Sequence, residues 1–301
     1  MADRAKHACR VPRVGWTETR TVVRAQGADD AGGRGPLRRG EVALPVTEYY
    51  RLAVRRGAHP ADERSVRPTI LPRGQGHIDR VFSITFRHLN DVAVNAGYWS
   101  SLVLDFYRRT TGKKDFRGDI GDKFPVAQAS NPRIAARALA LIALTTHYAD
   151  RWEPVFDLAF IDPRWSQPGN PRLPQGFFAS LTPTWQRDCA LRSDCARRMA
   201  LVEIDVLVAQ ALGLTLDELL LIYRAQFPVM PQYERDTWCD IEGRIVFTSS
   251  KGLMGVGAAA LGRCALEFSD GPHRLIIEYV APVATASREA DYRSVWVFFA
   301  A

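Results

Sequence analysis

The residues of this chain best suited to binding chemistry form a basic cluster between positions 107 and 117. Its members are Tyr107, Arg108, Arg109, Lys113, Lys114 and Arg117. Guanidinium and ammonium groups bind phosphates, and arginine also reads the edge of guanine. We therefore interpret the cluster as a candidate DNA-binding loop. Aspartates at nearby positions dilute the positive charge, so a solvated loop is the competing interpretation.

The sequence contains no complete set of catalytic or metal-binding residues. It lacks a Walker motif, a GxSxG nucleophile motif and an HExxH metal motif. Its five cysteines form no CxxC pair, and its six histidines are dispersed. The glycines of GVGAAALG, residues 255–262, suggest a phosphate-binding loop, but the surrounding order of elements is wrong for one. We therefore expect no catalytic residue, no cofactor-binding residue and no metal ligand in this chain.

A short segment, DPRW at residues 162–165, resembles the (N/D/S)PP(Y/F) loop of amino-methyltransferases. That loop positions the amino group of a flipped base. In this chain Arg164 occupies the place of the second proline. We interpret the segment as an ordinary turn.

The composition is that of a globular protein with a sizeable core. The chain has 301 residues, of which 47% are hydrophobic and 24% are charged. It has no apolar run long enough to span a bilayer and no secretory signal, so we expect a cytoplasmic protein without a membrane partner. The net charge is +7, and residues 1–40 alone carry +5. That balance is compatible with nucleic-acid binding but does not establish it.

The elements that would position a binding loop are organised around a helical pair at residues 197–228. Apolar residues recur at helical spacing up to Gly213, where a helix can end in a positive-φ conformation. Thr215 and Glu218 form a capping-box pattern that starts the second helix. Asp205 projects to the buried side, where we expect a structural ion pair with an arginine. The second helix is too apolar to lie in a DNA groove, so we interpret the pair as a buried brace.

The rest of the chain mixes strands with helices. Alternation with period two predicts a strand at residues 81–86, and a further strand is predicted at 274–280. We expect a hairpin at 236–248 and helices at 131–150 and 287–299. The fold class is therefore α+β, with strand segments and loops flanking a central helical bundle, followed by a C-terminal hairpin or sheet and a terminal helix.

We divide the chain into four regions. Residues 1–45 form a weakly structured basic segment, and residues 46–130 form an α+β region of recognition type. Residues 131–232 form the helical region with the central brace. Residues 233–301 contain the hairpin, a strand and the terminal helix.

Four long phrases together resemble one protein family. They are residues 69–83 (TILPRGQGHIDRVFS), 98–126, 185–253 and 288–299 (READYRSVWVFF). They look like the C-terminal, target-recognition region of bacterial adenine-specific, S-adenosylmethionine-dependent DNA methyltransferases. Those enzymes belong to restriction–modification and phage-defence systems, including the type IIG-like class. In that family the cofactor and catalytic motifs lie upstream of this region, and the present sequence contains neither motif.

The resemblance implies a DNA-binding, target-recognition portion of an N6-adenine DNA methyltransferase, with double-stranded DNA as its partner. The chain itself would hold no cofactor, and S-adenosylmethionine is implied for the full-length enzyme. The chain alone is expected to be inactive, so a separate catalytic subunit or nuclease is a further expected partner. It would be a split subunit, a fragment or a mispredicted gene start. Two alternatives stay open: a scaffold that docks such a subunit through residues 131–227, and a non-functional remnant of a truncated gene.

Overall fold

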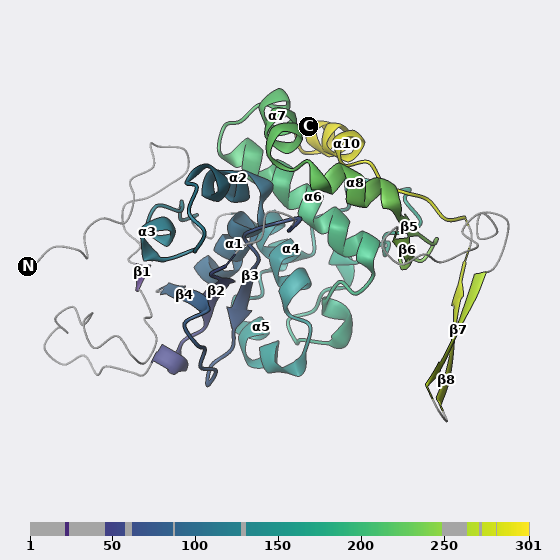
Figure 1. Cartoon of the computed structure of the whole chain (residues 1–301). Coiled ribbons are helices and arrows are strands. Elements are labelled where there is room, and N and C mark those ends of the chain that lie inside the picture. Colours follow the sequence, from purple (N-terminus) through teal and green to yellow (C-terminus); the bar gives the residue numbers. More distant parts are fainter. Residues whose placement is uncertain are drawn as a thin grey trace, which may run out of the picture.

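The computed structural model describes residues 22–23, 46–57, 62–86, 88–127, 131–248, 264–270, 273–280 and 282–300. The expected basic segment at 1–45 lies outside these ranges except for Val22–Val23, and the glycine loop at 255–262 lies outside them entirely. Helices and small antiparallel sheets make up the described residues, which confirms the predicted α+β class (Figure 1). Within the same ranges, none of the helices combines the length and apolar character needed to cross a bilayer.

A four-stranded antiparallel sheet forms the N-terminal part of the fold. Its strands, in order across the sheet, are β1 (Val22–Val23), β4 (Val81–Phe86), β2 (Arg51–Arg55) and β3 (Pro68–Leu71). β4 is the strand predicted from alternation, but its last four residues are all buried. Since successive side chains of a strand point to opposite faces, both faces of β4 are covered there.

Two helices separated by one residue follow the sheet. α1 (Leu89–Ser100) packs against β2, β3 and β4 on one side and against α4 on another. α2 (Leu102–Thr110) starts at Ser101, whose hydroxyl accepts the amide hydrogen of Leu104 at 3.3 Å. A loop then leads to α3 (Gly118–Gly121), which is a single helical turn.

The helix predicted over residues 131–150 begins as expected but divides into two. α4 (Pro132–Ile142) is capped by Asn131, and α5 (Ala149–Val155) follows after a break. The break coincides with carbonyls of α4 that bond to other parts of the chain. The Ala140 carbonyl, for example, accepts the amide hydrogen of Leu191 at 2.8 Å. The helix therefore ends where tertiary partners replace its own hydrogen bonds.

The central pair consists of α6 (Asp194–Ala211) and α7 (Leu216–Gln226). Between them, Gly213 has a φ of +76°, as expected for a glycine after a helix. The Thr215 hydroxyl accepts the Glu218 amide hydrogen at 3.3 Å, and the Glu218 carboxylate accepts the Thr215 amide hydrogen at 2.7 Å. The predicted capping box is thus confirmed, and its hydrogen bonds lower the pKa of Glu218.

In its described residues, the C-terminal part contains one helix that the sequence did not predict. Pro228, the last residue of the predicted helical pair, is the N-cap of α8 (Val229–Asp236), a position that needs no backbone N–H. The predicted hairpin is present as β5 (Thr237–Cys239) and β6 (Ile245–Thr248). The predicted terminal helix is α10 (Arg288–Ala300), which packs on α6 and α7 (Figure 1).

A second hairpin extends away from the helices at the right of Figure 1. Its strands are β7 (Cys264–Asp270) and β8 (His273–Tyr279), and β8 is the strand predicted at 274–280. Short 3-10 helices, each of three residues, lie among the connecting segments. They are Val46–Glu48, Thr146–Tyr148, Leu158–Phe160, Phe178–Ser180 and Arg187–Cys189.

Candidate nucleic-acid interface

The candidate loop joins α2 to α3 and is fastened at both ends. The buried Arg108 donates a hydrogen bond from its guanidinium to the Lys114 carbonyl at 2.8 Å. The Phe116 amide donates to the Arg56 carbonyl at 2.8 Å, and the Phe116 ring is only 1% exposed. Gly112 turns the chain after α2 with a φ of +65°. The loop backbone is therefore held in one conformation by the core beneath it.

The side chains of Arg109 and Tyr107 pack against other parts of the fold. The Arg109 guanidinium donates to the Asp62 carbonyl at 3.0 Å and lies over the Phe227 ring at 4.4 Å from its centroid. The Tyr107 ring packs edge-on against Phe124, with the ring centroids 5.7 Å apart. These contacts join α2 to the end of α7 and to the segment that follows α3.

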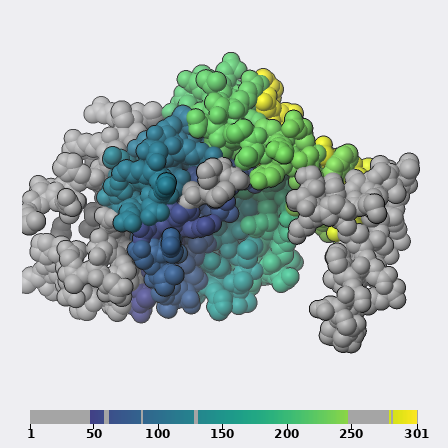
Figure 2. Space-filling model, in the orientation of Figure 1, coloured from purple at the N-terminus to yellow at the C-terminus, as the bar shows by residue number. Residues whose placement is uncertain are grey.

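Lys113, Lys114 and Arg117 lie on the outside of the loop, and all three are exposed. Exposed fractions of 50% and 64% for the Lys113 and Arg117 side chains mean that solvent reaches both charges. Lys113 pairs with Asp119, and Arg117 donates to Asp115 at 3.4 Å. The hydrogen bond from Arg117 lowers the pKa of Asp115. Figure 2 shows this blue-green part of the chain at the surface beside the green residues of the C-terminal half.

The structure thus separates the six candidate residues into two groups. Tyr107, Arg108 and Arg109 hold the loop in place, whereas Lys113, Lys114 and Arg117 present charge to solvent. The sequence could not make this division, because it does not show that Arg108 folds back onto Lys114, and the partners of Arg109 lie on elements far away in the chain.

Asp205, expected to form a structural ion pair, is the centre of a buried network. Its carboxylate accepts hydrogen bonds from Arg64 at 2.9 and 2.7 Å, from the Leu102 amide at 2.7 Å and from the Tyr292 hydroxyl at 2.7 Å. The Arg288 guanidinium also lies 3.4 Å from the Asp205 carboxylate. Burial opposes the charge of Arg64, but Asp205 more than offsets that effect and raises the pKa of the guanidinium. The expected arginine partner is therefore Arg64, which precedes β3.

The network continues from α6 into α8 and α10. Arg288 donates from Nε to Glu234 at 2.9 Å and contacts the Glu63 carboxylate at 3.2 Å. The Arg198 guanidinium forms ion pairs with the Glu234 carboxylate at 2.9 Å and with the Asp291 carboxylate at 2.7 Å. Buried charges of this kind are tolerated because each has an opposite charge and several hydrogen bonds. They bind helices together and leave no carboxylate free for catalysis in the network.

The DPRW segment is a turn without helix or strand, as interpreted from the sequence. A second buried ion pair supports it, in which Arg137 donates to Glu203 at 2.6 Å. The same guanidinium donates to the Arg164 carbonyl at 2.9 Å, and the Ser166 amide donates to Glu203 at 2.7 Å. Trp165 is 3% exposed and anchors the turn in the core.

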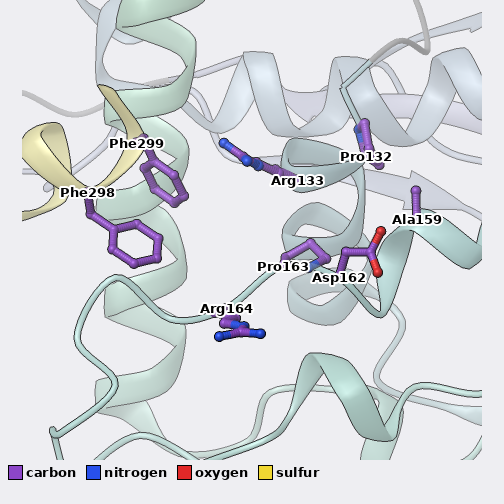
Figure 3. Close-up of a pocket in the computed structure, with 8 residues that line it drawn as sticks. All are labelled: Pro132, Arg133, Ala159, Asp162, Pro163, Arg164, Phe298 and Phe299. Atoms are coloured by element: carbon purple, nitrogen blue, oxygen red, sulfur yellow. The ribbon is translucent and has the colours of Figure 1, made fainter. Parts of the chain in front are cut away.

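This turn also lines a pocket of about 300 Å³, which could not be found from the sequence because its walls are far apart in the chain (Figure 3). Its walls come from three distant segments: the first turn of α4, residues 159–164 and the end of α10. Two arginines and two aromatic rings face into it. The main lining residues are Arg133, Asp162, Pro163, Arg164, Phe298 and Phe299.

Comparisons with protein-family models, with curated proteins and with solved structures give no match for this chain. Across the ranges that the structure describes, no group of three or more His, Cys, Asp and Glu side chains could hold a metal ion. The exposed basic loop and the pocket are therefore the two surface features from which binding can be argued.

Proposed function

We propose that this chain is a DNA-binding, target-recognition portion of an N6-adenine DNA methyltransferase of a restriction–modification or phage-defence system, located in the cytoplasm. One structural observation carries the proposal: three exposed cations project from a loop whose backbone is anchored by Arg108 and Phe116. A preorganised loop loses little conformational entropy when it binds, so less of the favourable binding free energy of its charges is offset. The long phrases that resemble the methyltransferase family give further support.

The role of the chain would be contact with DNA rather than chemistry. Lys113 and Lys114 would approach phosphates as point charges, and the planar guanidinium of Arg117 would bind a phosphate or a guanine edge with two hydrogen bonds. Lys113 and Arg117 would exchange exposed carboxylate partners for phosphates. That exchange costs little, since exposed ion pairs contribute only about 0–1 kcal/mol. Methyl transfer to a flipped adenine would take place on a separate catalytic unit.

The salt dependence of duplex binding tests this role. We expect the logarithm of the binding constant to fall linearly with the logarithm of salt concentration, because bound cations release counterions from DNA. Reversing Lys113, Lys114 and Arg117 to Glu should weaken binding and flatten the slope by up to about 3 units, since each lost phosphate contact removes about 0.9. Fluorescence anisotropy with a labelled duplex measures both quantities.

A matched triple variant controls for total charge. Arg187, Arg235 and Arg293 are also exposed, lie on other elements, and can be reversed to Glu together. The proposal requires a much smaller effect on the slope from this variant than from the loop variant. Equal effects of the two triple variants on the slope would show that binding depends on overall charge and not on the loop. Absence of duplex binding at low salt would favour the scaffold alternative.

A second measurement tests whether the chain alone can transfer a methyl group. The purified chain, mixed with DNA and radiolabelled S-adenosylmethionine, is expected to transfer no methyl group. Methyl transfer by the purified chain without any partner would contradict the division of roles that we propose.

A further inference from the structure

We propose that the pocket between α4, residues 159–164 and the end of α10 docks a segment of a partner protein that carries an acidic side chain beside apolar ones. This surface shares no residue with the basic loop, and the proposal does not depend on DNA binding. The pocket is built from the same turn, DPRW, that sequence reasoning left without a role.

The two arginines of the pocket lack the partners that other arginines of this fold have. Arg64, Arg137 and Arg288 each bond to a carboxylate in the core. By contrast, the exposed guanidiniums of Arg133 and Arg164 have no hydrogen bond or ion pair with any residue in the part of the chain that the structure describes. Both line the pocket, with Arg133 above and Arg164 below Pro163 in Figure 3, so each attracts an acidic side chain that enters it. Arginine binds carboxylates with paired hydrogen bonds in a planar geometry.

The aromatic wall of the pocket consists of two rings in contact. The Phe298 and Phe299 rings lie 5.1 Å apart at 78°, an edge-to-face arrangement. Arg133 lies over the Phe299 ring at 5.7 Å from its centroid. Arg137, whose charge is neutralised by Glu203, lies 5.4 Å from the same centroid. The wall therefore offers an apolar surface whose Phe299 ring is held between neighbouring groups.

Exposed apolar side chains also occur next to the lining residues in the chain. Leu158 and Ile161, which flank the lining residues 159 and 162 in the chain, are 72% and 37% exposed. Val297, next to Phe298 in α10, is 69% exposed, and Phe298 itself is 38% exposed. Exposed apolar side chains around a binding pocket are common at protein–protein contact sites. Aromatic residues and arginine are enriched in such interfaces.

The net charge of the pocket lining favours a partner segment with an acidic side chain. Two guanidiniums and the single carboxylate of Asp162 leave the pocket lining with one excess positive charge, which complements one acidic side chain. A nucleic acid is a poorer occupant, because its phosphates would meet the carboxylate of Asp162. The geometry thus favours a protein segment in which Asp or Glu adjoins Leu, Phe or Trp.

Selection from a phage-displayed library of short random peptides on the intact chain tests the proposal. We expect the enriched peptides to combine an acidic residue with a neighbouring large apolar residue. A synthetic copy of an enriched peptide should bind at least about tenfold more weakly to the Arg133→Glu/Arg164→Glu variant, and also more weakly to Phe298→Ala. Arg187→Glu, a charge reversal of an exposed arginine outside the pocket, should bind the peptide as the unaltered chain does.

Several results would overturn the proposal. These are failure to enrich any peptide, enriched peptides without acidic residues, and equal binding by the pocket variants and the unaltered chain. Displacement of the peptide by a short single-stranded DNA would identify a nucleic-acid site instead. Because both arginines are exposed, Arg164→Ala gives a second variant that leaves the buried Arg137–Glu203 pair in place. The variant with Lys113, Lys114 and Arg117 reversed should still bind the peptide, which separates this test from that of DNA binding.

Discussion

Asp205 lies in the middle of α6 with no exposed surface, and each of its oxygens accepts more than one hydrogen bond. A carboxylate transferred from water to such a position loses its hydration, and only opposite charges and oriented donors compensate for that loss. Arg64, Arg288 and the Tyr292 hydroxyl are those groups, and each is itself buried. Removal of the central charge would leave the buried Arg64 guanidinium without its carboxylate, whereas Arg288 would keep Glu234 and Glu63.

We therefore expect Asp205→Asn to lower the free energy of unfolding by about 3 to 5 kcal/mol, although the side chain keeps its size. Urea denaturation followed by circular dichroism measures the change. Glu289→Gln is the matched control, because its ion pair with Arg224 lies at the surface. The control should lose less than about 1 kcal/mol. Equal losses in the two variants would show that burial of the network contributes nothing.

At the scale of elements, the close approach of α1 to α4 depends on one missing side chain. A Cβ atom built on Gly97 would lie 2.4 Å from Cγ2 of Ile134 and 3.4 Å from Cβ of Ala138. Glycine inside a helix normally costs about 1 kcal/mol relative to alanine. Its presence in the buried part of α1 is explained by the distance between the two helices, which any larger residue would increase.

Gly97→Ala should consequently destabilise the protein by about 1 to 3 kcal/mol, the usual effect of overpacking, despite the better helix propensity of alanine. Gly169→Ala is the control, because a Cβ there meets no atom within 4 Å. Thermal or urea unfolding compares the two. If steric contact is the cause, Ile134→Ala in the same chain should partly compensate, and the two losses should not add.

Local and long-range features of these elements differ in how well the sequence predicts them. The α7 cap depends on Thr215 and Glu218, three residues apart, and the sequence predicted it correctly. The extra helix α8 and the division of the 131–150 helix were missed, because the end of α4 is set by partners such as Leu191. For the same reason the sequence identified the basic loop but not which of its cations are exposed, and it did not reveal the pocket.

At the scale of the whole molecule, several buried tyrosines link stability to alkaline pH. Burial raises the pKa of Tyr292 well above its ordinary value of 10.0 and raises that of Tyr223 to about 12. A group with a raised pKa in the folded state stays protonated when the unfolded chain has already lost its proton. Its contribution to stability is therefore complete below pH 10 and is lost as pH rises towards the folded pKa.

The urea concentration at the midpoint of unfolding should accordingly decrease as the pH rises from about 10 to about 12. Tyr223→Phe should make this fall shallower, because one of the titrating groups is removed. Tyr49→Phe, at a side chain that is 38% exposed, should leave the pH dependence as it is. A Tyr223→Phe profile parallel to that of the unaltered chain would exclude this residue as a source of the effect.

The contact between Arg288 and Glu63 spans 225 positions of the chain, and it has a consequence for synthesis on the ribosome. Arg64 and Asp205 are synthesised before Arg288 and Tyr292, which complete their network. Until then the nascent chain carries an incomplete set of core charges, and long-range closure of this kind is slow. Synthesis of α10 is therefore the step at which the central network can first close.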